Sequence, residues 1–178
     1  MESYTIIVLI FGLIILLLLV VLFFINRLSL YRRRIDNSLI TVSDTLDMRI
    51  KLIDEMIAFI KKNLEHEKSY VKKLEQIKKY LQAFSKKKPS FDNFNQNENN
   101  FLHFTTLEKT YTNLNKNEEY LNLKEKALNN QDKLIYALDE FDKGVAQYND
   151  YRSKKINLLI SKLFFFPKYD CYKNNYDI

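Results

Sequence analysis

The chain opens with an unbroken run of apolar side chains. Residues 6–25 contain no charged residue, and only Gly12 interrupts the large apolar side chains. As an α-helix that rises about 1.5 Å per residue, this run is about 30 Å long, which matches the hydrocarbon layer of a bilayer. A cleaved signal peptide has a basic start and a shorter apolar core, whereas this chain starts with Glu2 and no basic residue. The pattern therefore predicts an uncleaved membrane-spanning helix within residues 1–25.

A second apolar pattern begins at Ile35 and repeats at intervals of three and four residues, as one face of an amphipathic helix does. Its inward positions are Leu39, Val42, Leu46, Ile50, Ile53, Ile57, Ile60, Leu64, Val71, Leu74, Ile77, Leu81 and Phe84. The stripe thins across residues 61–70, so a bend or break there stays open. The pattern predicts one long helix, or two consecutive helices, over residues 35–84.

A polar segment separates this pattern from the next. Residues 85–100 lack an apolar period and contain Pro89 and many asparagines, which predicts a solvated loop. A short helix is expected to follow, because Phe104, Leu107, Tyr111 and Leu114 share one face. Thr105 and Glu108 have the spacing of a capping box at its start.

The last long pattern predicts a helix that starts after a cap at Asn115 or Asn117. Its inward side chains are expected to be Leu121, Leu128, Ile135, Leu138, Phe141, Val145 and Tyr148. Its solvated side is expected to carry Lys124, Glu125, Asp132, Lys133, Asp139, Glu140 and Lys143. In the core we expect Leu46, Ile53 and Ile57 to lie against Leu128, Ile135 and Leu138.

The composition also favours helices, because two glycines and two prolines in 178 residues leave little material for hairpin turns. The predicted fold is all-α: an N-terminal transmembrane helix followed by an antiparallel bundle of long helices. The expected division is an anchor over residues 1–25, a helical bundle over residues 26–163 with a polar loop near 85–100, and an aromatic tail over residues 164–178. The single Cys171 cannot form an internal disulfide, which suits a reducing cytoplasm.

Basic residues cluster just after the apolar run, where Arg27, Arg32, Arg33 and Arg34 stand against Glu2 before it. By the positive-inside rule, the C-terminal side is expected in the cytoplasm and the N-terminus outside. These arginines are also predicted to contact lipid headgroups, where each charge contributes roughly 1 kcal/mol against an anionic leaflet. Acidic residues are interspersed with the other basic runs, so no nucleic acid is expected as a partner.

The C-terminal segment "INLLISKLFFFPKY", residues 156–169, should come close to the membrane, because the last helix must run back toward it. Apolar and aromatic side chains with basic flanks are typical of interfacial segments. Headgroup contact is therefore predicted for Lys162, Phe164, Phe165, Phe166 and Lys168. The alternative is that the three phenylalanines fold back and cap the bundle, and the sequence leaves both open.

The residue types that carry chemistry are scarce. His66 and His103 are the only histidines, and neither belongs to an H-E-x-x-H zinc pattern. No glycine-rich loop is present that could cradle phosphates. We therefore predict no catalytic residue, no cofactor and no metal site, and we expect that the protein is not an enzyme.

Two stretches of the chain carry a pattern seen in a known family. In residues 115–150 the positions of this pattern are Asn117, Glu118, Tyr120, Leu121, Leu123, Leu128, Val145, Tyr148 and Asn149, and the upstream stretch is "LDMRIKLIDEMIAFIKKNLEHEKS", residues 46–69. Together they resemble the signature and the upstream helix of the LemA family of bacterial membrane proteins. The single span followed by "LYRRRIDNSL" is similar as well. The sequence departs from the family where a tryptophan is usual, near Leu39, and in the region after Lys154. The resemblance implies a single-pass protein of a bacterial cell membrane with a cytoplasmic helical domain.

The expected function is that of a membrane-anchored, non-enzymatic scaffold that engages membrane lipid and a protein partner, with an oligomer as an option. One alternative is a coiled-coil factor for membrane assembly or fusion, which needs an exposed apolar heptad seam. A second alternative, a small metal-dependent enzyme, needs a pocket of clustered polar groups.

Overall fold

The computed structural model describes residues 2–84 and 94–172. The elements in this part of the chain are α1 (Glu2–Asn63), α2 (Lys68–Phe84), α3 (Phe94–Leu102), the 3-10 helices η1 (His103–Lys109) and η2 (Thr112–Lys116), α4 (Glu118–Ser153) and α5 (Lys155–Leu163). No strand occurs among them. The all-α fold predicted from the sequence is confirmed.

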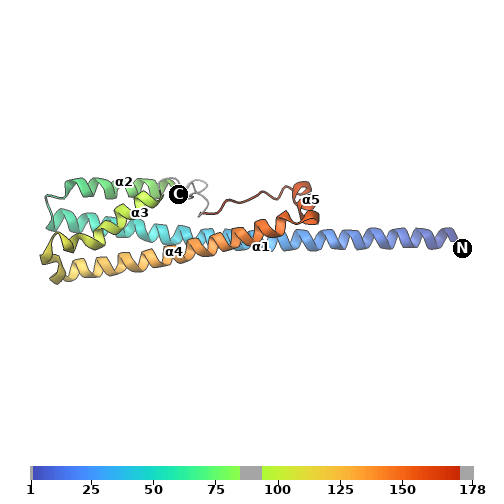
Figure 1. Cartoon of the computed structure of the whole chain (residues 1–178), viewed down its shortest axis with the longest axis horizontal. Helices are drawn as coiled ribbons and strands as arrows, with labels where there is room; N and C mark the ends of the chain where they lie inside the picture. The colour runs from blue at the N-terminus through green and yellow to red at the C-terminus, as the bar shows by residue number, and fades with distance from the viewer. Residues whose placement is uncertain (1, 85–93, 173–178) are drawn as a thin grey trace.

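α1 is the spine of the molecule, and the other long helices run antiparallel to it (Figure 1). α4 packs along the second half of α1, and α2 packs on α1 as well. α3 lies against α2, and η1 and η2 lead from α3 into α4 at the end far from the N-terminus. The first part of α1 projects alone, and α5 lies beside α1 where this projection begins (Figure 1).

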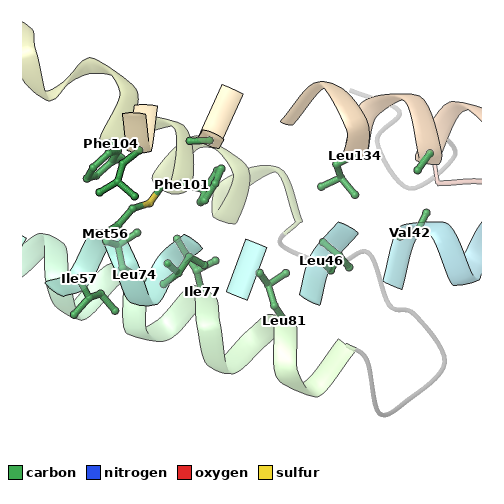
Figure 2. Close-up of a cluster of buried hydrophobic side chains, with 14 of the residues drawn as sticks. Val42, Leu46, Met56, Ile57, Leu74, Ile77, Leu81, Phe101, Phe104 and Leu134 are labelled. Atoms are coloured by element: carbon green, nitrogen blue, oxygen red, sulfur yellow. The ribbon is translucent and has the colours of Figure 1, made fainter. Parts of the chain in front are cut away.

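The core follows the apolar stripe of α1. Val42, Leu46 and Ile53 are at most 1% exposed, and the predicted burial of Ile57 and of Leu138 on α4 is also confirmed. Figure 2 shows Leu74, Ile77 and Leu81 of α2 directed toward α1, and Phe101 and Phe104 close to Met56. Large branched residues at regular spacing therefore account for this interface.

The first helical pattern is divided in the structure. α1 ends at Asn63, and the Leu64 carbonyl then accepts a hydrogen bond from the Glu67 amide at 2.9 Å. The Glu67 carbonyl accepts bonds from the amides of Tyr70 and Val71, both at 3.1 Å. The break that the sequence left open is therefore present, and it falls where the apolar stripe thins and an extended helix would have little to bury.

Part of the segment expected to be a loop is helical. Of the expected loop over residues 85–100, residues 85–93 lie outside the described part, and residues 94–100 belong to α3, so for these the prediction is wrong. Phe101 at the end of α3 is fully buried, and the Glu98 carboxylate bonds Arg49 of α1. These two contacts hold a helix that has no regular apolar period.

The short α-helix expected around residues 104–114 is replaced by η1 and η2. The Thr105 hydroxyl donates to the Leu102 carbonyl at 2.7 Å, and η1 has no side-chain cap, so the predicted capping box is wrong. Phe104, Leu107 and Leu114 are nevertheless buried, as expected. A 3-10 helix aligns residues three apart, so the inward spacing of Phe104 and Leu107 suits it as well.

α4 begins at one of the two expected caps, since the Asn117 side chain accepts a hydrogen bond from the Tyr120 amide at 2.9 Å. The predicted phase of its first half is wrong. Leu121, Leu128 and Ile135 are 41%, 42% and 56% exposed. The buried positions are Tyr120, Leu123, Ala127, Asn130, Leu134, Ala137, Leu138, Phe141, Asp142, Val145 and Tyr148. The inward face of this half includes Ala127 and Asn130, whereas several large aliphatic side chains lie outside. The positions of the large aliphatic residues therefore predicted the wrong face.

Candidate membrane interface

From Ile6 onward, the projecting part of α1 has an apolar, outward-facing surface. Every residue from Tyr4 to Val20 is exposed, whereas Leu28 is fully buried. α1 is the one helix in the described part of the chain that is long and apolar enough to span a membrane, and none of its most apolar window is buried. Such a large exposed apolar surface is compatible with a membrane anchor.

The four predicted arginines lie where this apolar surface ends. Arg27, Arg32, Arg33 and Arg34 are all exposed. The guanidinium carbons of Arg27 and Arg34 lie 5.6 Å and 5.9 Å from the centre of the Tyr31 ring, within the range of cation–π contacts. The structure thus places four exposed positive charges on α1 directly after the apolar segment.

α5 is formed by a sharp turn at the end of α4. Lys154 is extended, with φ −60° and ψ 139°, and so ends α4 before α5 begins at Lys155. The buried Asn157 fixes this turn, because its side-chain amide donates to the Tyr151 carbonyl at 2.6 Å. Ile160 and Ser161 also face the bundle and are at most 8% exposed.

The outer face of α5 is apolar. Ile156, Leu159 and Leu163 are 62%, 72% and 71% exposed. In a soluble protein the most apolar face of a surface helix points toward the core, but here the buried face contains Asn157 and Ser161. Such an exposed apolar face is typical of a helix that lies against a membrane or against another protein.

The three phenylalanines after α5 do not behave as one unit. Phe164 is 45% exposed and Phe165 is 90% exposed, while Phe166 packs against the core. Phe165 has a φ of 55°, a left-handed conformation that turns the chain back, and it points away from the bundle. The predicted lysines, Lys162 and Lys168, are both exposed. Phe164 and Phe165 thus extend the apolar face of α5, and Phe166 takes the capping position.

The chain after α5 is a strap hydrogen-bonded to α4, residues 166–172. Arg152 Nε donates to the Phe166 carbonyl at 2.9 Å, and the Tyr148 hydroxyl donates to the Pro167 carbonyl at 2.7 Å. Asn149 donates to the Tyr169 carbonyl at 2.7 Å and accepts from its amide at 3.3 Å. Burial raises the pKa of Tyr148 to about 12, so this phenol stays a donor at neutral pH. The strap holds α5 against α1 and α4.

A second polar centre lies in the core, away from α5. Arg49 is 1% exposed; its Nε donates to Asn130 Oδ1 at 2.8 Å and its Nη2 to Gln131 Oε1 at 2.6 Å. Its Nη1 bonds the Glu98 carboxylate, and its guanidinium lies 4.2 Å from the centre of the Phe101 ring. Burial lowers the pKa of Arg49 and raises that of Glu98. One side chain of α1 therefore ties α3 to α4.

The two histidines take part in neither centre. His66 and His103 are exposed, and a hollow of about 760 Å³ borders His66 between the end of α1 and α2. Within residues 2–84 and 94–172, no group of three or more His, Cys, Asp and Glu side chains is placed to hold a metal ion.

Sequence reasoning located the arginines and the aromatic tail but missed the buried Arg49 centre and the hydrogen bonds that hold the strap. Arg49, Tyr148 and Asn149 lie in the two stretches that carry the family resemblance, and that was the available signal. No sequence pattern indicated Asn157 or the hydrogen bonds of the strap. In a sequence, a buried asparagine cannot be distinguished from one at the surface.

A family model described as the LemA family matches residues 38–177, which is most of the chain. The match begins in the bundle part of α1 and includes α4, α5 and the strap. Comparison with curated proteins and with solved structures gave no match. The match agrees with the resemblance in the sequence, and the chain belongs to the LemA family.

Proposed function

We propose that this protein is a membrane-tethered scaffold, attached to the bilayer both by α1 and by the outer face of α5. The carrying observation is the exposed apolar surface of Ile156, Leu159, Leu163 and Phe165 beside the end of the apolar part of α1. Its role is non-enzymatic and consists of presenting the helical bundle to lipid and protein partners at the membrane surface.

The energetics favour placing α5 in the interface. Full burial of a leucine or isoleucine side chain contributes about 1.5–3 kcal/mol, so several half-buried ones contribute several kcal/mol together. Lys155 and Lys162 flank the apolar face and add attraction to an anionic leaflet. A spanning helix alone already prevents dissociation. The second contact therefore fixes the tilt and rotation of the bundle rather than its retention.

This geometry gives the scaffold a defined reach. α1 is continuous from Glu2 to Asn63, so no hinge separates the anchor from the bundle. The 37 residue steps from Asn26 to Asn63 correspond to about 55 Å. The α1–α2 turn, η1 and η2 are then held far from the bilayer, where a cytoplasmic protein partner can reach them.

Vesicle flotation tests the contact of α5 with the membrane. We expect a fragment of residues 26–178 to float with phosphatidylglycerol vesicles at low salt, since α5 replaces the deleted anchor. The variant Ile156→Ser, Leu159→Ser, Phe165→Ser should stay at the bottom of the gradient. The matched control is Leu121→Ser, Leu128→Ser, Ile135→Ser, which removes three exposed apolar residues of α4 and should float. An intact fragment that does not float would leave α1 as the sole attachment.

The proposed orientation places the N-terminus outside and the bundle in the cytoplasm of a bacterial cell, because Arg27 and Arg32–Arg34 follow the span. A cysteine introduced by Ser3→Cys should react with an impermeant thiol reagent in intact cells, while Cys171 should react only after lysis. The opposite labelling pattern would reverse the proposed topology.

One observation favours a second candidate, a factor that assembles through coiled-coil pairing. Leu121, Leu128 and Ile135 are exposed on α4 at intervals of seven residues, the spacing of a heptad seam. Sedimentation of the full chain in detergent tests it, because a pairing seam requires a dimer or larger oligomer that Leu128→Lys dissociates.

A further inference from the structure

Three aromatic rings meet where α1 leaves its apolar segment. The ring centre of Tyr151, near the end of α4, lies 6.4 Å from that of Phe24 and 5.4 Å from that of Tyr31, both on α1. Tyrosine rings are frequent at this level of membrane proteins, because the ring is apolar and the hydroxyl seeks a polar partner. The cluster is therefore at the depth of lipid headgroups if α1 spans the bilayer.

The hydroxyl of Tyr151 lacks such a partner. It is buried, and no hydrogen-bond partner for it is found within the described residues. Tyr148, one turn earlier, donates its hydroxyl to the Pro167 carbonyl, so a phenol at this end of α4 is normally satisfied. An unpaired buried hydroxyl is unfavourable, which points to an acceptor that completes the site.

Two cationic side chains lie near the tyrosine rings of this cluster. The Arg27 guanidinium lies over the Tyr31 ring, and Lys154 Nζ lies 5.9 Å from the centre of the Tyr151 ring. The exposed Asp150 forms an ion pair with Lys154 at 3.4 Å. Burial raises the pKa of Tyr151 while the Arg27 charge opposes the shift, so the phenol is a neutral donor near pH 7. The acceptor should thus be an anion.

We propose that Tyr151, Arg27 and Lys154 bind the phosphate of an anionic phospholipid. This inference rests on the proposed membrane position of the bundle and names the ligand there. The Tyr151 hydroxyl donates to a phosphate oxygen, and the two cations neutralise its charge. Phe24 and the faces of the tyrosine rings contact the glycerol and the upper acyl chains. Arg27 and Lys154 are both exposed, so their flexible side chains can turn aside to admit the phosphate to the hydroxyl.

The same chemistry would suit free phosphate, and the position of the cluster distinguishes the two sources. Phe24 belongs to the last turn of the apolar run, and a soluble anion gains nothing from it. A lipid phosphate carries its own apolar chains, which fit that surface. We therefore expect binding to require the acyl chains.

The test uses the full chain in phosphatidylcholine nanodiscs, with its melting temperature followed while phosphatidylglycerol is added. Phosphatidylglycerol should raise the melting temperature of the wild type. Tyr151→Phe removes only the hydroxyl, and we expect it to need about tenfold more phosphatidylglycerol to reach half of its maximal rise in melting temperature. Arg27→Gln should weaken the response similarly. Tyr136→Phe, an exposed tyrosine of α4 remote from the cluster, is the matched control and should respond as the wild type does.

Two outcomes would overturn the inference. An equal response of Tyr151→Phe and the wild type would show that the hydroxyl takes no part. Stabilisation by inorganic phosphate alone, in phosphatidylcholine discs, would assign the site to a soluble anion. A fluorophore at Leu159 in the same discs reports separately on α5. If it stays in water while phosphatidylglycerol still distinguishes Tyr151→Phe, the contact of α5 fails and the lipid site stands.

Discussion

At the scale of single residues, Arg49 shows how one charge is accommodated in an apolar helix interface. Its planar guanidinium offers a fixed fork of donors, and acceptors from Glu98, Asn130 and Gln131 meet that fork. Asn130 is itself held, because its amide donates to the Thr45 carbonyl at 3.0 Å. Such a buried network adds little net stability over apolar packing, but it fixes which helix faces meet.

A pair of substitutions measures the contribution of the Arg49 network to the free energy of unfolding. Arg49→Met leaves the largely buried Glu98 without its cation, and we expect it to lower the free energy of unfolding by about 3–5 kcal/mol. Adding Glu98→Leu removes the unpaired carboxylate and should restore most of the loss. Urea denaturation of the full chain in detergent, followed by circular dichroism, gives both values. A single variant as stable as the wild type would show that Arg49 is not paired in the core.

At the scale of elements, α4 shows that the buried face of a helix need not be the face with the largest aliphatic side chains. Its first half packs on α1 through Tyr120, Ala127 and Leu134, while Leu128 and Ile135 remain outside. Adjacent residues on the same helix should therefore differ sharply in their tolerance of charge.

Leu134 and Ile135 provide that comparison, at 0% and 56% exposure. Leu134→Asp buries an unpaired charge and should cost several kcal/mol, enough to unfold the bundle. Ile135→Asp should change the free energy of unfolding by about 0.5 kcal/mol or less. Thermal melts of the full chain in detergent test both. The reverse ranking would restore the phase expected from the sequence, and a large effect of Ile135→Asp with loss of an oligomer would favour the coiled-coil candidate.

The sequence could predict the elements whose inward faces carry large branched residues at regular spacing, as Val42, Leu46 and Ile53 do on α1. It could not predict α3, because a salt bridge and Phe101 hold that helix within an asparagine-rich tract. At the candidate interface, the arginines and phenylalanines could be predicted, because charged and aromatic residues beside an apolar run are typical of membrane interfaces. The strap was not, because Tyr148 and Asn149 hold it through backbone carbonyls and amides that no side-chain pattern encodes.

At the scale of the whole molecule, we propose that α5 and the strap give a membrane-tethered bundle a fixed orientation. α1 alone would let the rod turn about its own axis and tilt in the bilayer. α5 projects its apolar face beside the anchor, and the strap bonds of Tyr148, Asn149 and Arg152 keep it there. In the proposed function, the contact between α5 and lipid would then set the orientation of the distal surfaces toward cytoplasmic partners.

The depth of α5 in the bilayer tests this account most directly. An environment-sensitive fluorophore is attached at Leu159→Cys in a Cys171→Ser background, and the full chain is reconstituted in phosphatidylglycerol-containing vesicles. The control probe is at Tyr136→Cys, which is 67% exposed on α4 and remote from α5. We predict blue-shifted emission at Leu159 that lipids with a shallow nitroxide quench, and water-like, unquenched emission at Tyr136. Water-like, unquenched emission at both positions would contradict the account.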